Sequence, residues 1–256
     1  MNGIFNIMIN NKDSETSFGF KNVQVKEKPA LVQGVFESVA KKYDIMNDFM
    51  SAGIHRLWKN TFVDMINPQA DMKLLDVAGG TGDIAFRFME NGGGSVFVCD
   101  LTEGMVRVGR DRSMDKGILN SIQWTVGDAQ KLPMQDSSVD VYTIAFGLRN
   151  VTEIEQALAE AYRVLKPGGR FMCLEFSHVV LPVLDKIYDK YSFDILPKIG
   201  EFVAGDKESY VYLVESIRRF PKQDVLIEKM QNTGFENTSY KNLTGGIACI
   251  HSGWKI

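Results

Sequence analysis

The stretch that decides the fold reads Leu74-Leu75-Asp76-Val77-Ala78-Gly79-Gly80-Thr81-Gly82-Asp83. It predicts a buried strand that ends in a glycine-rich turn and opens a helix, which is the arrangement that nucleotide-type cofactors need. Glycines let the backbone approach a ligand because they have no Cβ, and the amides at the start of the helix face the same point. We therefore expect Asp76, Gly80 and Gly82 to lie at a cofactor site. The alternative is a tight strand-to-helix corner without a ligand.

A carboxylate follows the next predicted strand. Residues 95–99 predict this strand, of which 96–99 are apolar, and Asp100 comes directly after them. An acid at the end of the second strand, about this far beyond the glycine turn, is typical of a side chain that binds ribose hydroxyls. Asp100 is therefore our candidate ribose ligand.

The bulk composition fits one α/β domain. The chain has 256 residues, of which 45% are hydrophobic and 24% are charged, so it can bury one sizeable core. Its net charge of −3 argues against a nucleic-acid partner, since such binders carry a basic field. Cys99, Cys173 and Cys249 are odd in number and lie in apolar runs, which predicts reduced thiols in the core and a reducing compartment.

The N-terminal stretch carries little structural signal. Residues 1–28 have no sustained period, so we expect a loose arm. No lysine or arginine precedes Lys12, which fits neither a secretory signal nor a transit peptide. No apolar run approaches the roughly 18 residues that a membrane-spanning helix needs.

Helices and strands alternate over most of the chain. Apolar residues recur at helical spacing from Pro29 onward and again over residues 54–66, and we expect these N-terminal helices (29–71) near an edge of the sheet or over its mouth. Strands are then predicted at residues 73–78, 95–99, 121–126, 139–146 and 170–176, and helices at 82–91, 103–116 and 153–165. This order predicts right-handed crossovers and a doubly wound, mostly parallel sheet.

The pattern changes after residue 176. Residues 178–221 are apolar and aromatic, with Tyr188, Tyr191, Phe193, Tyr210 and Tyr212 at helical spacing, which predicts a helical insertion. A helix over 223–233 follows, and strands at 237–243 and 246–253 predict a C-terminal antiparallel hairpin. We take 29–256 as one domain.

The ends of the strands also suggest how a nucleoside would be held. Ligands of such sheets bind at the carboxyl ends of the strands. Asp128 follows the third strand and is placed to accept from the amine of an adenine, and the Ala129 amide is placed to reach a ring nitrogen. The alternative for this Gly-Asp pair is a plain turn.

The acids around the glycine turn point to the class of cofactor. A pyrophosphate would be repelled by Asp76 and Asp83, whereas a cofactor with a sulfonium and an amino group would not. The turn has no Walker lysine after it, which counts against ATP. The local charges therefore favour S-adenosylmethionine.

Several longer blocks carry a resemblance. The glycine turn, Asp100, Asp128-Ala129 and the run from Arg163 to Arg170 resemble class I S-adenosylmethionine methyltransferases, a Rossmann-like fold. More narrowly, residues 18–256 resemble the ubiquinone/menaquinone biosynthesis C-methyltransferases in blocks beginning Tyr43-Asp44-Ile45, Gly53-Ile54-His55, Phe146-Gly147-Leu148-Arg149-Asn150, Leu174-Glu175-Phe176 and Tyr212-Leu213-Val214.

The resemblance implies an activity and a cofactor site. It implies methylation of a ring carbon on a polyprenylated benzoquinol, and of demethylmenaquinol where that quinone is made. Thr81, Asp100, Asp128 and Ala129 would bind S-adenosylmethionine. By that resemblance, many relatives carry serine at the position of Ala145, so only a backbone contact is expected there. Other open readings are a methyltransferase for another small molecule or a nucleic acid, and a non-catalytic member of a quinone-biosynthetic complex.

Three residues are candidates for the chemistry. Ring carbon becomes nucleophilic when the acceptor carries a phenolate, which Arg149, beside Asn150, would stabilise directly or through a bound water. The alternative for Arg149 is a surface ion pair. Tyr43, together with Asn47, would close over the acceptor and bond its ring oxygens, or would serve only as part of an ordinary amphipathic helix.

The remaining expectations concern groups that take no part in the chemistry, and the protein's surroundings. We expect His55, His178 and His251 to be structural, and no metal, because no ligand spacing is present. The aromatic insertion would be a packed lid or a channel for the polyprenyl tail. We expect a homo-oligomer, as a dimer, contacts with a quinone-biosynthesis complex, and peripheral contact with a membrane. Arg218-Arg219 would either contribute to that contact or form a solvated helix end. The expected place is the bacterial cytoplasm beside the inner membrane, the alternative being the matrix side of the mitochondrial inner membrane.

Overall fold

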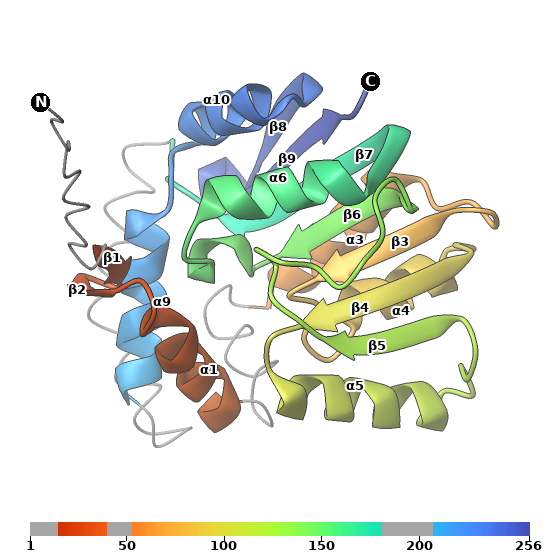
Figure 1. Ribbon diagram of the computed structural model, residues 1–256, viewed down its shortest axis with the longest axis horizontal. Helices are drawn as coiled ribbons and strands as arrows, with labels where there is room; N and C mark the ends of the chain where they lie inside the picture. The colour runs from red at the N-terminus through yellow and green to blue at the C-terminus, as the bar shows by residue number, and fades with distance from the viewer. Residues whose placement is uncertain (1–14, 40–52, 181–206) are drawn as a thin grey trace, which may run out of the picture.

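The glycine-rich stretch lies at the centre of one large sheet. A computed structural model describes residues 15–39, 53–180 and 207–256. Within them, seven strands form a sheet in the order β5-β4-β3-β6-β7-β9-β8 (Figure 1). The strands are β3 (Lys73–Val77), β4 (Ser95–Asp100), β5 (Ile122–Val126), β6 (Val139–Ala145), β7 (Leu165–Phe176), β8 (Glu236–Leu243) and β9 (Ala248–Trp254). The strand order reverses between β3 and β6, which is where such sheets bind ligands.

The pairing confirms the predicted topology. Strands β5, β4, β3, β6 and β7 pair in parallel, whereas β9 is antiparallel to both β7 and β8. The two C-terminal strands are joined at the short turn η5 (Thr244–Gly246). The three cysteines lie buried in β4, β7 and β9 as free thiols, as predicted.

Helices cover both faces of the sheet. In Figure 1, α6 (Ile154–Val164) and α10 (Gln223–Thr233) lie in front of it, and α3 (His55–Ile66) and α4 (Asp83–Glu90) lie behind. Neighbouring residues of β3 show the division, since Leu74 packs in the cluster with Phe62 and Leu75 packs in the cluster with Leu158. Side chains of a strand alternate between its faces, so each central strand feeds two cores. Helix α5 (Glu103–Asp115) packs beside β4 and β5.

The two N-terminal helices take different places. Helix α1 (Lys28–Val39) lies over the carboxyl ends of the strands, one of the two places predicted. Helix α3 instead packs on a face of the sheet, because Trp58, Phe62 and Ile66 form one apolar stripe that is buried there. It ends at Ile66, in agreement with the predicted range 54–66, because Asn67 takes a left-handed conformation (φ 57°) before Pro68.

The prediction of a loose N-terminal arm is wrong for residues 15–24. Strands β1 (Glu15–Phe18) and β2 (Lys21–Gln24) form an antiparallel hairpin. Its turn needs Gly19, which has φ +59° and where a Cβ would lie 2.2 Å from Glu215 Oε2. The Phe18 ring stacks on Tyr212 at 4.2 Å, and the Phe20 amide donates to Glu215 at 2.9 Å. Contacts with a helix nearly 200 residues away hold the hairpin, and local periodicity cannot reveal them.

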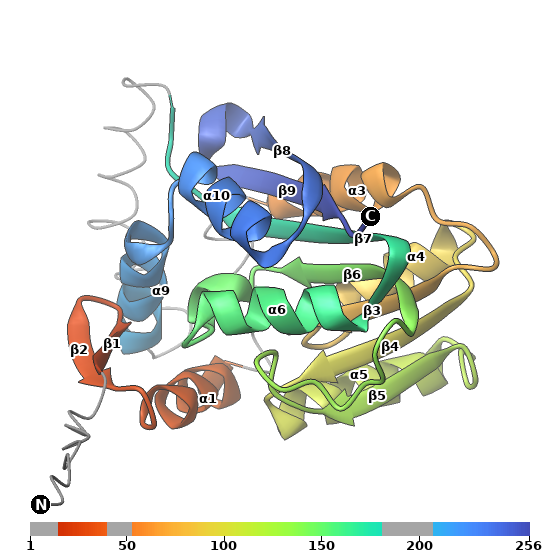
Figure 2. The same cartoon turned by 45° about the horizontal axis from the view of Figure 1, so that its top comes forward.

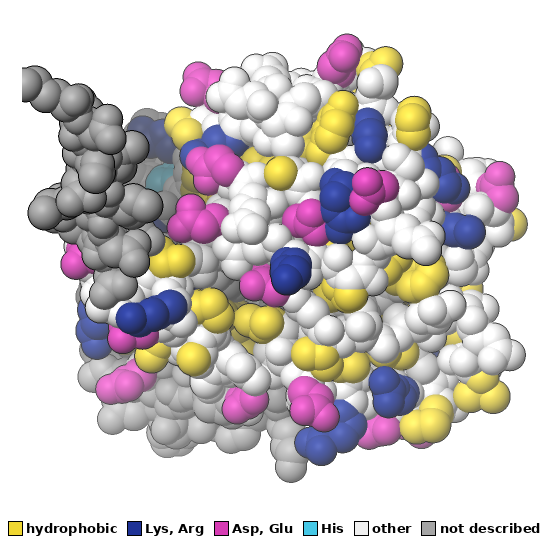
Figure 3. All heavy atoms as spheres, in the orientation of Figure 1, with side chains coloured by type: hydrophobic (Ala, Val, Ile, Leu, Met, Phe, Trp, Pro, Cys, Tyr) yellow, Lys and Arg dark blue, Asp and Glu magenta, His cyan; other side chains and the backbone are white. Residues whose placement is uncertain are grey.

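The insertion is helical where the structure describes it. Helix α9 (Lys207–Arg219) carries Tyr210 and Tyr212, both buried. Residues 181–206, with Tyr188, Tyr191 and Phe193, lie outside the described residues. In the part of the chain that is described, no helix is long and apolar enough to cross a membrane. Lysine and arginine side chains are interspersed with aspartate and glutamate on the face shown in Figure 3.

Candidate active site

A cavity opens where four parallel strands end. Its walls are the residues that follow β3, β4, β5 and β6, and α1 closes it from the other side with Pro29, Val32 and Phe36. The strands point toward this end of the molecule, where α1, α9 and the β1–β2 hairpin gather (Figures 1 and 2). The convergence predicted from sequence is therefore present. The strand ends contribute Gly80, Asp100, Asp128, Ala129 and Asn150, all of them predicted site residues.

The glycine turn leaves room for a ligand at one position. Gly80 has φ +56°, and a Cβ built on it would meet nothing within 4 Å, so the space beside its Cα is open. Gly82 (φ +85°) is different, because a Cβ there would lie 2.4 Å from the Trp124 ring. That glycine is required for packing, and its contact with a cofactor stays a prediction.

Asp100 ties the turn to the second strand. One of its carboxylate oxygens accepts from the Gly80 amide and the other from the Thr102 amide, each at 2.8 Å. The residue is 9% exposed, and burial raises the pKa of its carboxyl while these hydrogen bonds oppose the rise. Each oxygen keeps a free acceptor position, so the side chain is held ready to bind hydroxyl groups.

Asp128 forms the turn that was its alternative and also lines the cavity, so its predicted contact with an adenine stays a prediction. Its carboxylate accepts from the Gln130 amide at 2.9 Å and from the Gln130 side chain, which is the hydrogen bonding of a turn. Asp128, Ala129 and Gln130 also line the cavity. The Gln130 side-chain oxygen in turn accepts from the Glu153 amide at the start of α6. The turn is thus fixed to a helix and presents its edge to the cavity.

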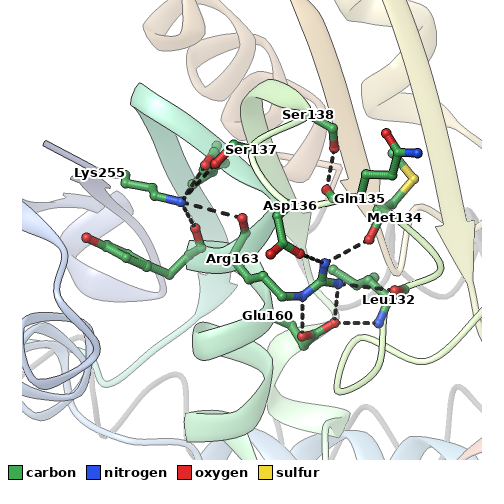
Figure 4. A network of polar contacts seen from close by, with 11 residues as sticks. Leu132, Met134, Gln135, Asp136, Ser137, Ser138, Glu160, Arg163 and Lys255 are labelled. Atoms are coloured by element: carbon green, nitrogen blue, oxygen red, sulfur yellow. Dashed lines mark hydrogen bonds and ion pairs between the residues drawn. The ribbon is translucent and has the colours of Figure 1, made fainter.

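A second anchor holds the same loop farther along (Figure 4). The Arg163 guanidinium on α6 donates to both Glu160 oxygens, to Asp136, and to the Leu132 and Met134 carbonyls. Glu160 also accepts from the Leu132 amide at 2.8 Å. Helix α6 therefore fixes the connection between β5 and β6, which carries the Asp128 turn.

We expect Arg163→Ala to loosen this connection. Several hydrogen bonds are lost at once, so the free energy of unfolding should fall by roughly 1–3 kcal/mol. S-adenosylmethionine should bind several-fold more weakly, because the Asp128 turn is no longer held. Thermal unfolding and calorimetric titration measure the two effects. Arg110→Ala, at an exposed position of α5, is the matched control. Unchanged stability in Arg163→Ala would contradict the anchoring role.

Asp76 is a buried acid with one free oxygen. Its Oδ1 accepts from the Thr143 hydroxyl at 2.8 Å, and its Oδ2 has no hydrogen-bond partner among the described residues. Burial, opposed by the Thr143 bond and reinforced by Asp100 and Asp83, raises its pKa to about 7. Asp76 lines a second small cavity, beside the first, with Thr81 and Ala145. This free oxygen fits the amino or sulfonium group of the expected cofactor.

Asp83 does not act as the free acid that we inferred from sequence. Its carboxylate pairs with Lys59 at 2.6 Å and with Arg87 at 3.2 Å. Burial alone would raise its pKa, but the neighbouring Lys59, Arg87 and Arg112 hold the pKa below its ordinary value. Of the two acids that we expected to repel a pyrophosphate, only Asp76 lacks a cationic partner at hydrogen-bond distance among the described residues. Thr81 is likewise engaged, since its hydroxyl accepts from Arg112 at 2.7 Å and keeps its own proton to donate.

We expect the stability of Asp76→Asn to exceed that of the wild type above neutral pH. The folded state holds its Asp76 proton up to a pKa of about 7, whereas the unfolded chain loses it near 3.8. Folded protein thus binds more protons between these values, so this carboxyl makes stability fall as pH rises through the window. Asparagine removes that dependence. The melting temperature of Asp76→Asn minus that of the wild type should increase as pH rises from 4 to 8. A difference that stays constant over this range would contradict the prediction.

Arg149 lies in a buried ion pair and not at the surface. Its guanidinium donates to Glu175 at 2.7 Å and to the Phe146 carbonyl, and neither side chain of the pair is exposed. Burial raises the pKa of Glu175, and Arg149 opposes the rise. The Arg149 Nε and one terminal nitrogen have no hydrogen-bond partner among the described residues. The guanidinium therefore holds unused donors close to the end of β6.

Asn150 connects this pair to the cavity. It belongs to the short helical turn η2 (Leu148–Asn150) directly after β6, and it lines the cavity. Its side-chain oxygen accepts from the Tyr212 hydroxyl of α9 at 3.0 Å. Tyr43 and Asn47 lie outside the described residues, so their predicted roles remain predictions.

The histidines take structural places. His178 donates to the Phe220 carbonyl at 2.8 Å, and His251 lies buried in β9, where burial lowers its pKa to about 4. His55 is the first residue of α3 and is 2% exposed.

The residues that hold the predicted site residues in place were not predicted from the sequence. Glu175, Lys59 and Gln130 each fix one of them, and only Glu175 left a signal, as the single acid in the otherwise apolar run over residues 171–176. An isolated charge in a buried strand requires a partner of opposite charge.

Comparison with known proteins gives a consistent picture. Residues 21–255 match the model of the ubiE/COQ5 methyltransferase family. The chain is 54% identical over 250 residues to the Ubiquinone/menaquinone biosynthesis C-methyltransferase UbiE of Roseobacter denitrificans, covering 97% of this chain and 100% of that protein.

Solved structures share the fold. A SAM-dependent methyltransferase of Thermotoga maritima, described as a possible histamine N-methyltransferase, superposes with a TM-score of 0.63 at 19% identity, covering 88% of this chain and 100% of that one. Phosphoethanolamine N-methyltransferase 2 of Haemonchus contortus, solved in complex with S-adenosyl-L-methionine, gives a TM-score of 0.58 at 15% identity, covering 77% of this chain and 52% of that one. The seven-stranded sheet is thus the class I methyltransferase fold.

Proposed function

The chain belongs to the ubiE/COQ5 methyltransferase family, and from this premise we propose that it transfers a methyl group from S-adenosylmethionine to a ring carbon of a polyprenylated benzoquinol. Demethylmenaquinol is a second acceptor where that quinone is made. The observation that carries the acceptor chemistry is the buried Arg149, which keeps unused donors next to the end of β6. A carbon acceptor needs such donors because its ring must carry negative charge before it attacks.

The residues around the cavity suit the cofactor. The open space at Gly80 would take a nucleoside against the backbone, and Asp100 would accept from the ribose hydroxyls. The Asp128 turn would face the adenine, and Asp76 would meet the amino acid part through its free oxygen. Ala145 offers only its backbone, as the resemblance implies. When bound, S-adenosylmethionine supplies an electrophilic methyl group on a sulfonium.

The chain's own groups would prepare the acceptor. A quinol hydroxyl loses its proton to solvent water, and the resulting phenolate spreads its charge onto the neighbouring ring carbon. That carbon would form the new bond to the methyl carbon as the bond from the methyl to sulfur breaks, and S-adenosylhomocysteine would leave. The methylated ring carbon then loses its own proton to solvent and the ring oxygen takes one up, which restores the quinol. Arg149 stabilises the phenolate with its unused donors, and Glu175 keeps the guanidinium in place. Asn150, itself oriented by Tyr212, would bond the second ring oxygen. Holding the ring against the methyl group supplies much of the remaining rate enhancement.

The surroundings of the reaction are part of the proposal. A polyprenyl quinol partitions into membranes, so we place the protein in the bacterial cytoplasm at the surface of the inner membrane. Assembly as a dimer and with other enzymes of quinone biosynthesis would shorten the path of such a poorly soluble intermediate.

Removing the chain from its host tests this function. Mass spectrometry of the quinone fraction should show accumulation of the quinone that lacks one ring methyl group, and the wild-type chain should restore the methylated product. Asp100→Ala, expressed at the same level, should not. An unchanged quinone profile in the deletion strain would contradict the proposal.

A further inference from the structure

A groove with mostly apolar walls lies beside the active site. It runs between α1, α9 and the β1–β2 hairpin, and it encloses about 610 Å³. We call it the α1–α9 groove, lined by Phe18, Leu31, Gly34, Val35, Val211 and Tyr212. These elements lie together at the end of the sheet where the parallel strands point (Figures 1 and 2). The volume falls within the roughly 300–1,000 Å³ typical of small-molecule sites.

One face of α1, residues of α9 and the ring of Phe18 form the apolar walls of the groove. Leu31, Gly34 and Val35 are three and four residues apart on α1, so they share one face of that helix. Val211 and Tyr212 face the groove from α9, and Phe18 stacks against Tyr212 with its ring inclined by 21°. Gly34 leaves the groove wide, because a Cβ there would meet nothing within 4 Å.

One wall of the groove is linked to the cofactor cavity by a hydrogen bond. Tyr212 lines the groove, and its hydroxyl donates to Asn150, which lines the cofactor cavity. A molecule lying along the groove would therefore reach the place where we expect the acceptor ring. The charged lining residues are Lys21, Glu208 and Glu215, and the last already accepts from the Phe20 amide.

The hairpin exposes an aromatic side chain close to the groove. Phe20 is 49% exposed, between Phe18 and Lys21 of the lining, and the Arg219 guanidinium lies 5.8 Å from its ring. Leu31, on the wall itself, is 41% exposed. An apolar ring beside a cation suits the boundary between membrane and water, where a lipid chain would enter.

We propose that the α1–α9 groove binds the isoprenoid tail of the methyl acceptor. This inference rests on the proposed function and adds where the tail lies. The occupant follows from the apolar walls, the volume, and the continuity with Asn150: a branched hydrocarbon chain attached to a ring fits all three. Burial of the tail would then contribute to binding of the acceptor in proportion to its length within the groove.

Filling the groove tests the inference. Gly34→Phe places a ring into the open space, and it also replaces a helix glycine by a better helix former, so α1 should remain folded. Gly34→Ala gives a similar backbone effect without filling the groove and is the matched control. The assay compares two benzoquinols in the same detergent, one with a single prenyl group and one with a geranylgeranyl chain.

We expect Gly34→Phe to raise KM for the geranylgeranyl quinol by roughly tenfold or more, equivalent to about 1.4 kcal/mol. Turnover of the prenyl quinol and affinity for S-adenosylmethionine should stay within a factor of two of the Gly34→Ala values. Equal losses with both quinols, or no loss with either, would overturn the inference.

A binding measurement separates this inference from the function. Calorimetric titration with geranylgeraniol, which has the tail but no ring, should show binding to the wild type and to Gly34→Ala, and weaker binding to Gly34→Phe. This result would support the groove even if neither quinol were methylated, in which case only the proposed reaction fails. Equal binding by all three proteins, or none by the wild type, would overturn the groove as the tail site.

Discussion

Asp100→Ala is expected to lose S-adenosylmethionine binding by about a hundredfold or more. Two charge-assisted hydrogen bonds to ribose hydroxyls would disappear, and each bond to a charged group contributes about 1.5–3 kcal/mol. The same substitution releases the Gly80 and Thr102 amides, which the carboxylate now holds at 2.8 Å. The glycine turn would then lose its fixed position against β4, and this adds to the loss.

Calorimetric titration with S-adenosylmethionine measures this effect directly. Asp111→Ala, at an exposed position of α5, is the control for removing one acid from the same part of the chain. Asp100→Asn should fall between the wild type and the alanine variant, because an amide oxygen still accepts but carries no charge. Affinity within threefold of wild type in Asp100→Ala would remove this residue from the cofactor site.

Arg149→Ala is expected to keep cofactor affinity and to lose turnover by roughly a hundred- to a thousandfold. Removing one donor from a site that stabilises a developing negative charge typically costs this much in kcat. Cofactor binding should be unchanged, because the described walls of the cofactor cavity do not include the Arg149 side chain. Single-turnover methyl transfer and S-adenosylmethionine titration separate the two effects.

A second variant is needed because Arg149→Ala also leaves its buried partner Glu175 without a counter-charge. Without the guanidinium, Glu175 would be a buried acid with no counter-charge, and a broken buried pair costs about 3–5 kcal/mol in stability. Arg149→Met/Glu175→Gln removes both charges and keeps similar volumes. We expect this double variant to fold, to bind the cofactor and to remain inactive. Near-normal turnover in the double variant would exclude Arg149 from the mechanism.

Most of the sheet could be predicted because its signals are local. Apolar runs broken by helical periods predicted the parallel strands. The helices predicted over 54–66 and 223–233 end where Asn67 and Gly234 take a left-handed backbone. The acids that end the strands could be predicted for the same reason. Asp100 and Asp128 follow strands that must be parallel neighbours, so the topology alone brings them to one cavity.

The predictions that the structure contradicts concern features that depend on contacts between residues far apart in the sequence. The hairpin over residues 15–24 is held by Tyr212 and Glu215, and its own sequence shows no sustained period. The pairing of Asp83 with Lys59 could not be read from the glycine turn, because α3 had first to be placed on the face of the sheet. Arg149 was predicted either at the reaction or in a surface pair. The surface pair is wrong, because the partner Glu175 is buried, and only the packing of β7 against η2 reveals this. The role of Arg149 at the reaction stays a proposal.

The most direct test is transfer of a labelled methyl group by the purified chain. The protein is incubated with S-adenosylmethionine carrying a trideuterated methyl group and with a chemically reduced polyprenyl benzoquinol in detergent, and the organic extract is analysed by mass spectrometry. We predict a product heavier by the labelled methyl group, with all three deuteriums retained and the methyl on a ring carbon. A label found on a ring oxygen, or no labelled quinone while the protein binds S-adenosylmethionine, would contradict the account.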